Sequence, residues 1–276
     1  MELLRKYRKA GNAGSFYSRD KLILERELSM FLESAPTLEL SRPLRAMVVP
    51  HAGYLYSGGV AARAYAQILN SRYWRVIVIA VSTKEQYPFC SIYPGLGYET
   101  PLGEVPIDQV FTKKLCSYSN FIQLSESGHS TKEYTIEVQL PFLQLCLGKF
   151  DLIPIMMGDQ NLDLINTLTE AIIKNIPAEN TLIVASSDLS HGHPDQKARV
   201  LDQLAIDMIN RFDEKRLWRE IQEQQTELSG YSAVIASMKI AKAMGAKEAK
   251  VLIHRHSGDI SGNTREVEGY LSAVIW

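Results

Sequence analysis

Cysteine is scarce in this sequence, and its scarcity excludes two kinds of site. Three cysteines, Cys90, Cys116 and Cys146, are scattered over 276 residues without a C-x-x-C pair. Their odd number argues against a disulfide framework, and their spacing argues against a cysteine zinc site. No apolar run reaches transmembrane length, and residues 1–11 carry charges but no apolar signal-peptide core. We therefore expect a cytoplasmic protein with no membrane partner.

A strong charge of one sign is also missing. The formal net charge is −1, so no overall field favours nucleic acid as a partner. The stretch GGVAAR (58–63) lacks the Walker Lys-Ser/Thr, and no G-x-S-x-G elbow of a serine hydrolase occurs. No linker, repeat or low-complexity tract interrupts the chain. We expect one domain over residues 1–276.

Short apolar runs alternate with helical patterns along the chain. The runs, of strand length and mostly rich in β-branched residues, are 44–50, 74–81, 151–157, 181–186, 249–253 and 270–275. The helical patterns are 20–34 (with Asp20 as candidate N-cap), 59–69, 108–118, 136–147, 162–175, 197–211, 213–225 and 231–244. This alternation predicts an α/β fold with a mostly parallel central sheet flanked by helices. The segment 86–106, rich in proline and glycine, predicts a long ordered loop or a β excursion.

Ionisable residues follow several of these runs, and ligands of α/β sheets bind at the carboxyl ends of strands. His51 comes directly after Pro50 at the end of the first run. Asp188 and His191 follow the run 181–186 at a spacing of i, i+3. They predict either a carboxylate that orients an imidazole or an Asp or Ser N-cap of the next helix.

Two further features leave alternatives open. Glu137 lies within an apolar helical pattern, so it is either a buried hydrogen-bonded anchor or part of a site. His254 and His256 would face the same way on a strand. No third ligand lies near them in the sequence, so the pair alone does not favour a metal site.

Several motifs together resemble the Memo family, the B component of the AmmeMemoRadiSam system. They are RKAGNAGSFY (8–17), VVPHAGYLYSGGVAARAY (48–65), TPLGEVPID (100–108), TIEVQLPFL (135–143), ASSDLSHG (185–192), and SGDISG with EVEGYLSA (257–273). The resemblance implies a fold similar to that of class III extradiol dioxygenases. Those are non-haem iron enzymes whose active site opens at the edge of the sheet.

The resemblance also implies a metal site and a cleft. The family's metal ligands are the His of PHAGY, a His of a P-S-H-H loop, and the Cys of a C-G pair. His51 matches the first, whereas Thr83 and Lys84 stand in the second motif and Ser229 stands in the third. A further histidine of the family is here Tyr134.

The family's remaining cleft positions are matched. Glu137, Asp188 and His191 agree with the family motifs, and Tyr54 lies in the PHAGY motif. The resemblance thus implies a cleft built from His51, Tyr54, Thr83, Lys84, Tyr134, Glu137 and Ser229. His191 and Asp188 are its catalytic candidates.

Hydroxyl groups are poor ligands for soft or borderline metals, so we expect a degenerate metal site and no cofactor. Iron, copper or zinc at His51 is the less favoured alternative. The preferred function is a non-catalytic or altered-ligand member that binds a small molecule or a protein partner in the cleft.

Two other functions stay open. One is a metal-dependent oxidoreductase, with non-haem iron or copper, whose site is rebuilt from His51, Asp188, His191 and either His254 or His256. The other is a metal-free hydrolase or transferase in which Asp188 orients His191 as general base. By family analogy, a radical-SAM protein and a third system component are expected partners.

Overall fold

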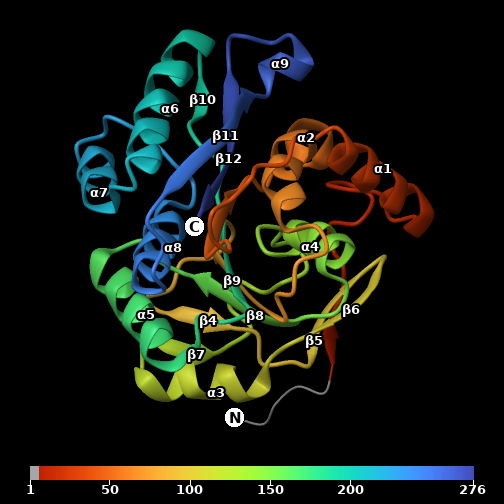
Figure 1. Ribbon diagram of the computed structural model, residues 1–276, viewed down its shortest axis with the longest axis vertical. Helices are drawn as coiled ribbons and strands as arrows, with labels where there is room; N and C mark the ends of the chain where they lie inside the picture. Colours follow the sequence, from red (N-terminus) through yellow and green to blue (C-terminus); the bar gives the residue numbers. More distant parts are fainter. Residues whose placement is uncertain (1–5) are drawn as a thin grey trace.

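A mixed β-sheet runs through the middle of the molecule in the computed structural model, which describes residues 6–276 (Figure 1). Residues 1–5, part of the stretch 1–11 considered above, lie outside the described residues. Within 6–276 the sheet has nine strands. In spatial order they are β10 (His191–His193), β12 (Val267–Ile275), β2 (Ala46–Val49), β9 (Thr181–Ser186), β3 (Arg75–Val81), β8 (Asp151–Met157), β4 (Cys90–Ile92) and β7 (Ile122–Leu124). The ninth strand, β11 (Ala249–His256), also pairs with β12.

The centre of the sheet is parallel and its flanks are largely antiparallel. Strands β2, β9, β3 and β8 pair in parallel, and β4 pairs in parallel with β7. Strands β12 and β4 join the central four in antiparallel orientation, and β12 also pairs with β10 and β11 in that orientation. The predicted α/β class is confirmed. The parallel pairs are concentrated in the central strands, which form from the longest runs rich in β-branched residues. On one flank, β12 is antiparallel to each of its neighbours, β2, β10 and β11.

The segment 86–106 makes the predicted β excursion. It contains β4 and then β5 (Gly97–Thr100) and β6 (Gly103–Pro106). Strands β5 and β6 form a small separate sheet with β1 (Tyr7–Arg8). This small sheet ties the start of the described chain to the middle of the sequence.

Helices cover both faces of the large sheet (Figure 1). One face is covered by α1 (Lys21–Glu33), α2 (Tyr54–Tyr65) and α4 (Leu140–Leu147). The other is covered by α3 (Gln109–Tyr118), α5 (Leu162–Asn175), α6 (Asp195–Asn210), α7 (Glu214–Gln222) and α8 (Tyr231–Ala243). The short elements are the 3₁₀ turns η1 (Ala66–Ile68) and η2 (Glu137–Gln139) and the helix α9 (Gly258–Ser261). No helix of residues 6–276 is long and apolar enough to span a membrane.

Local chemistry explains where the first two helices begin. Asp20 caps α1, because its carboxylate accepts hydrogen bonds from two amides of the first turn at 2.9 and 3.0 Å. Helix α2 begins at Tyr54 rather than at the predicted residue 59, with Gly53 as N-cap. Gly58 therefore lies inside α2, where a Cβ would come within 2.6 Å of the Phe31 ring. A glycine at this position allows α1 to pack closely on α2.

Candidate functional site

The register of the central strands brings three strand exits together. Val49 of β2 is paired with Ser186 of β9, so His51 and Asp188 each follow two residues after that pair. Thr83 follows the neighbouring strand β3 in the same direction. A hollow of about 700 Å³ opens at this edge, and all three residues line it. The site therefore lies where α/β sheets ordinarily bind ligands.

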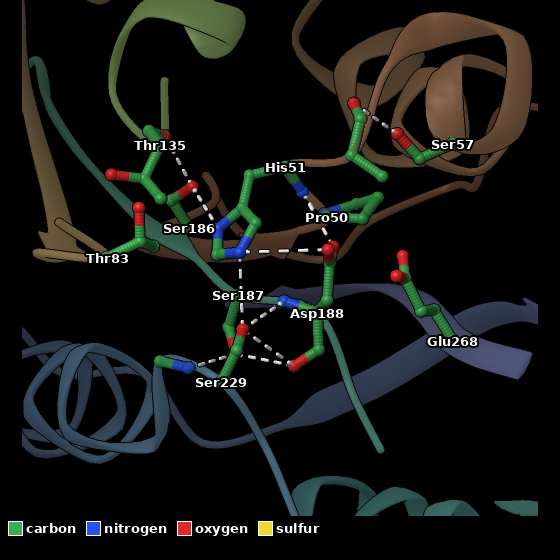
Figure 2. Close-up of polar contacts among 12 residues, drawn as sticks. Pro50, His51, Ser57, Thr83, Thr135, Ser186, Ser187, Asp188, Ser229 and Glu268 are labelled. Carbon is green, nitrogen blue, oxygen red and sulfur yellow. Dashed lines mark hydrogen bonds and ion pairs between the residues drawn. The ribbon is translucent and has the colours of Figure 1, made fainter. Parts of the chain in front are cut away.

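Both ring nitrogens of His51 are held by serine hydroxyls (Figure 2). Nδ1 lies 3.1 Å from Ser186 Oγ, and Nε2 lies 3.2 Å from Ser229 Oγ. Ser186 Oγ donates its only proton to the Thr135 carbonyl oxygen at 2.6 Å, because a carbonyl oxygen can only accept. Ser186 must then accept from His51. These contacts assign the proton of the neutral imidazole to Nδ1 and leave a lone pair at Nε2.

Ser229 is fixed beside His51 by the backbone of Asp188. The Asp188 amide donates to Ser229 Oγ at 3.0 Å, and the Ser229 amide donates to the Asp188 carbonyl oxygen at 3.1 Å. The Ser229 hydroxyl proton is then available to the lone pair of His51 Nε2. Gly230 permits this approach, since a Cβ there would lie 2.6 Å from the Ser186 carbonyl oxygen. The same closeness brings the start of α8 against the end of β9.

The Asp188 carboxylate also lies beside His51 Nε2 (Figure 2). Its Oδ1 accepts the backbone N–H of His51 at 2.8 Å, and its Oδ2 lies 3.7 Å from His51 Nε2. Burial raises the pKa of Asp188 above its ordinary value, and the neighbouring His51 partly offsets this rise. Glu268 lies beyond Asp188 in Figure 2, and its negative charge adds to the rise in that pKa.

A buried carboxylate that the sequence analysis did not select, Glu133, holds one wall of the cleft. It accepts a hydrogen bond from the Thr83 amide at 2.8 Å and lies 3.2 Å from the Thr83 hydroxyl. It also accepts from the Tyr134 amide at 3.0 Å. The Tyr134 ring stacks on Phe16 at 4.5 Å between centroids and meets His51 edge-on at 5.7 Å. Burial and the charges of Asp188 and Glu133 raise the pKa of Tyr134 to about 12, so its hydroxyl stays protonated.

The opposite wall comes from β12 and the segment before it. Glu266, Glu268 and Tyr270 line the cleft there, and the Tyr270 hydroxyl donates to Glu268 at 3.0 Å. The only sequence signal for these residues was the matched motif EVEGYLSA. Since residues alternate sides along a strand, Glu268 and Tyr270 share one side of β12.

Of the predicted site residues, six line the cleft: His51, Thr83, Tyr134, Asp188, His191 and Ser229. The other three, Tyr54, Lys84 and Glu137, are not among its lining residues. Tyr54 is buried and donates to the Val138 carbonyl oxygen at 2.6 Å. Lys84 is exposed, with its ammonium 5.5 Å from the centroid of the Tyr134 ring. The side chains of Tyr54 and Glu137 are therefore engaged beneath the cleft, whereas Lys84 lies beside it against the Tyr134 ring.

Glu137 is a buried anchor. Its carboxylate accepts hydrogen bonds from Arg8, from the Gly11 and Asn12 amides, from the Asn12 side chain and from the Tyr17 hydroxyl. The Arg8 and Glu137 side chains are 3% and 0% exposed, so the ion pair between them is buried. This resolves the alternative left open by the sequence in favour of the anchor.

The predicted pairing of Asp188 with His191 is also wrong. Asp188 contacts His51, whereas the side chain of His191 is 74% exposed and lies 3.4 Å from Glu268. The residues follow β9 in an extended connection and in strand β10, so they do not share a helical turn.

The histidines of β11 are engaged outside the cleft. His254 Nε2 lies 2.8 Å from the buried carboxylate of Asp202, and His256 Nε2 lies 2.6 Å from Asp195. Neither histidine is among the residues that line the cleft with His51.

The three positions that the resemblance implies as metal ligands carry one imidazole and two hydroxyls. Only His51 offers an imidazole, whereas Thr83 and Ser229 offer hydroxyls that contact Glu133 and His51. Over residues 6–276, no group of three or more His, Cys, Asp or Glu side chains is arranged to hold a metal ion. We therefore derive no chemistry through a metal at this site.

Fold and site together define an α/β protein with an ionisable cleft at the carboxyl ends of its central strands. The chain belongs to the Memo family, since the Memo-like protein family matches residues 8–274. It is 37% identical over 274 residues to a MEMO1 family protein of Sulfolobus acidocaldarius, covering 94% of this chain and 96% of that one. It is 33% identical over 281 residues to a MEMO1 family protein of Methanobrevibacter smithii, covering 97% and 99%.

The fold is also similar to a solved structure. The crystal structure of an uncharacterized Escherichia coli K12 protein matches with a TM-score of 0.54 at 10% identity. The match covers 85% of this chain and 100% of that one. At this identity the likeness concerns the fold alone.

Proposed function

We propose that this Memo-family protein binds a small organic cation, an amine or ammonium compound, in its cleft and does not retain the family's metal. The observation that carries the proposal is the charge of the cleft lining. Three carboxylates, those of Asp188, Glu266 and Glu268, line it. Within residues 6–276, no lysine or arginine is among its lining residues.

The aromatic walls support the same ligand class. Phe16, Tyr56, Tyr134 and Tyr270 line the cleft together with the carboxylates. The face of an aromatic ring attracts a cation, and this attraction grows when water is excluded. Tyr134 already has the ammonium of Lys84 at 5.5 Å from its ring centroid, so one ring of this wall is in contact with a cation.

Matched probes of opposite charge test this proposal. Benzylamine and benzoate have similar size and an aromatic ring, but one is a cation and the other an anion. We expect benzylamine to shift the NMR signals of cleft residues and benzoate to leave them unchanged. Glu268→Gln removes one carboxylate without changing the shape of the wall, and it should weaken benzylamine binding several-fold. Equal binding of the two probes would refute the proposal.

A metal-dependent oxidoreductase of the extradiol-dioxygenase type, with non-haem iron or copper, is the alternative. Elemental analysis of protein purified without chelators separates it from the organic-cation proposal. We expect iron, copper and zinc far below one ion per chain. A nearly stoichiometric metal that disappears in His51→Ala but persists in His193→Ala would overturn our proposal. His193 is a suitable control because it pairs with Glu227 away from the cleft.

The contacts also change which histidine the metal-free hydrolase or transferase hypothesis would use as its base. They favour His51, rather than His191, as its base, because Ser229 Oγ lies 3.2 Å from His51 Nε2. In that case turnover of a test ester would fall in both His51→Ala and Ser229→Ala and persist in His191→Ala.

The remaining expectations belong to the same proposal. They are a fold related to class III extradiol dioxygenases, membership in an AmmeMemoRadiSam system, and a cytoplasmic location. A radical-SAM protein and a third component would then be partners. Co-purification of tagged protein with these two components, compared between wild type and His51→Ala, tests whether the cleft takes part.

A further inference from the structure

A second hollow lies at the opposite ends of the strands that form the cleft. It is lined by Arg45 just before β2, by Arg72 and Tyr73 just before β3, and by Asn180 just before β9. These three strands are neighbours in the sheet and run in parallel. Each strand therefore begins at this hollow and ends at the cleft. The hollow has a volume of about 860 Å³.

We infer that this hollow binds an organic phosphate, meaning a small molecule with a phosphate group and an apolar body. Three arginines, Arg42, Arg45 and Arg72, line it, and Glu179 is its one carboxylate. The side chains that line the hollow thus carry three positive charges and one negative charge, whereas the whole chain carries a net charge of −1. The guanidinium group suits phosphate oxygens because it presents several N–H donors in one plane.

Among the carboxylates of residues 6–276, the three guanidinium groups have no partner. Within residues 6–276, no ion pair within 4.0 Å involves Arg42, Arg45 or Arg72, including with Glu179. Arg45 is held in place because its Nη1 donates to the Ala178 carbonyl oxygen at 2.9 Å. Arg42 and Arg72 are exposed and come from separate loops. The arginines of the hollow therefore come from two segments, one before β2 and one before β3.

The hollow also has an apolar side. Leu38, Leu40 and Leu44 line it, and all three belong to or pack on the hydrophobic cluster beneath α1 and α2. The Tyr73 hydroxyl donates to the Leu44 carbonyl oxygen at 2.9 Å, which fixes the ring against this side. This apolar side favours an organic phosphate over inorganic phosphate, since burying a ring or chain there adds hydrophobic free energy.

Titration with phenyl phosphate at constant ionic strength, followed by NMR, tests the inference. We expect it to bind wild-type protein more tightly than inorganic phosphate does. Arg42→Ala/Arg72→Ala should weaken binding by at least about tenfold, because each lost guanidinium removes charge-assisted hydrogen bonds. Both side chains are exposed, so thermal unfolding should confirm that the variant remains folded.

Arg26→Ala/Arg211→Ala is the matched control, since it removes two exposed arginines that do not line the hollow. Its affinity for phenyl phosphate should stay within about twofold of the wild type. Three results would overturn the inference: no binding by the wild type, equal affinities in the two double variants, or inorganic phosphate binding as tightly as phenyl phosphate. Benzylamine binding in the cleft should be unchanged in Arg42→Ala/Arg72→Ala, so failure at one site is distinguishable from failure at the other.

Discussion

Replacing Glu137 by glutamine tests the role of Glu137 as a structural anchor. Its carboxylate lies 2.5 Å from Arg8 Nη1 and accepts the Tyr17 hydroxyl and the Asn12 amide, both at 2.8 Å. In Glu137→Gln the charge is lost, and one oxygen becomes an NH₂ group that faces donors. The buried guanidinium of Arg8 then has no counter-charge.

The expected loss is large relative to the stability of a domain. Breaking a buried ion pair by removing one partner costs about 3–5 kcal/mol. Folded domains are typically stable by about 5–15 kcal/mol, so Glu137→Gln should unfold a visible fraction of the protein near 37 °C. Urea unfolding followed by circular dichroism measures the loss as a shift of the midpoint at constant slope.

Glu99→Gln is the matched control, because Glu99 also pairs with a cation from the N-terminal segment. The Lys9–Glu99 pair is 2.6 Å long, but its side chains are 75% and 29% exposed. Exposed pairs contribute about 0–1 kcal/mol. A loss in Glu137→Gln no larger than that of Glu99→Gln would refute the anchor. If Glu137→Gln kept its stability but lost benzylamine binding, Glu137 would belong to the cleft after all.

Three further predictions concern the cleft and a buried histidine. Burial raises the pKa of Asp188, so benzylamine binding should weaken as the pH falls through that raised pKa; Asp188→Asn should bind more weakly at pH 7 and lose this part of the pH dependence in the same NMR titration. Burial lowers the pKa of His129 from 6.5 to about 3. Between these two pH values, His129 is protonated in the unfolded chain and neutral in the folded protein. Stability should therefore fall as the pH drops below 6.5, by about 2 kcal/mol at pH 5, and urea midpoints should show a smaller fall in His129→Gln. Thr83→His/Ser229→Cys places an imidazole and a thiolate beside His51, and this variant should retain zinc through gel filtration where the wild type does not; an equal zinc content in both would contradict our view of the lost ligands.

The sequence predicted the frame of the molecule because its signals are local. Each of the six apolar runs overlaps one strand of the large sheet, and the Asp20 cap marks the start of α1. The strand exits at His51 and Asp188 followed from the same runs and a general property of α/β sheets. The family motifs added Thr83, Tyr134 and Ser229.

The rest depends on contacts between distant parts of the chain. Ser229 reaches His51 across 178 positions, and Glu133 reaches Thr83 across 50. The spacing of apolar and polar residues along the chain does not indicate such contacts, so Glu133 was not predicted. Motif membership also says nothing about where a side chain points, which is why Glu137 was placed in the cleft.

The tie between the N-terminal segment and Glu137 has a consequence for how the protein is made. Arg8 and Tyr17 meet their carboxylate partner across 129 and 120 positions. At about 5–20 residues per second, synthesis separates them by roughly 6–26 seconds. Until Glu137 leaves the ribosome, the segment that carries Arg8, Phe16 and Tyr17 lacks the carboxylate to which it binds. The stacking of Phe16 on Tyr134 therefore forms only after the segment between these two residues has been synthesised.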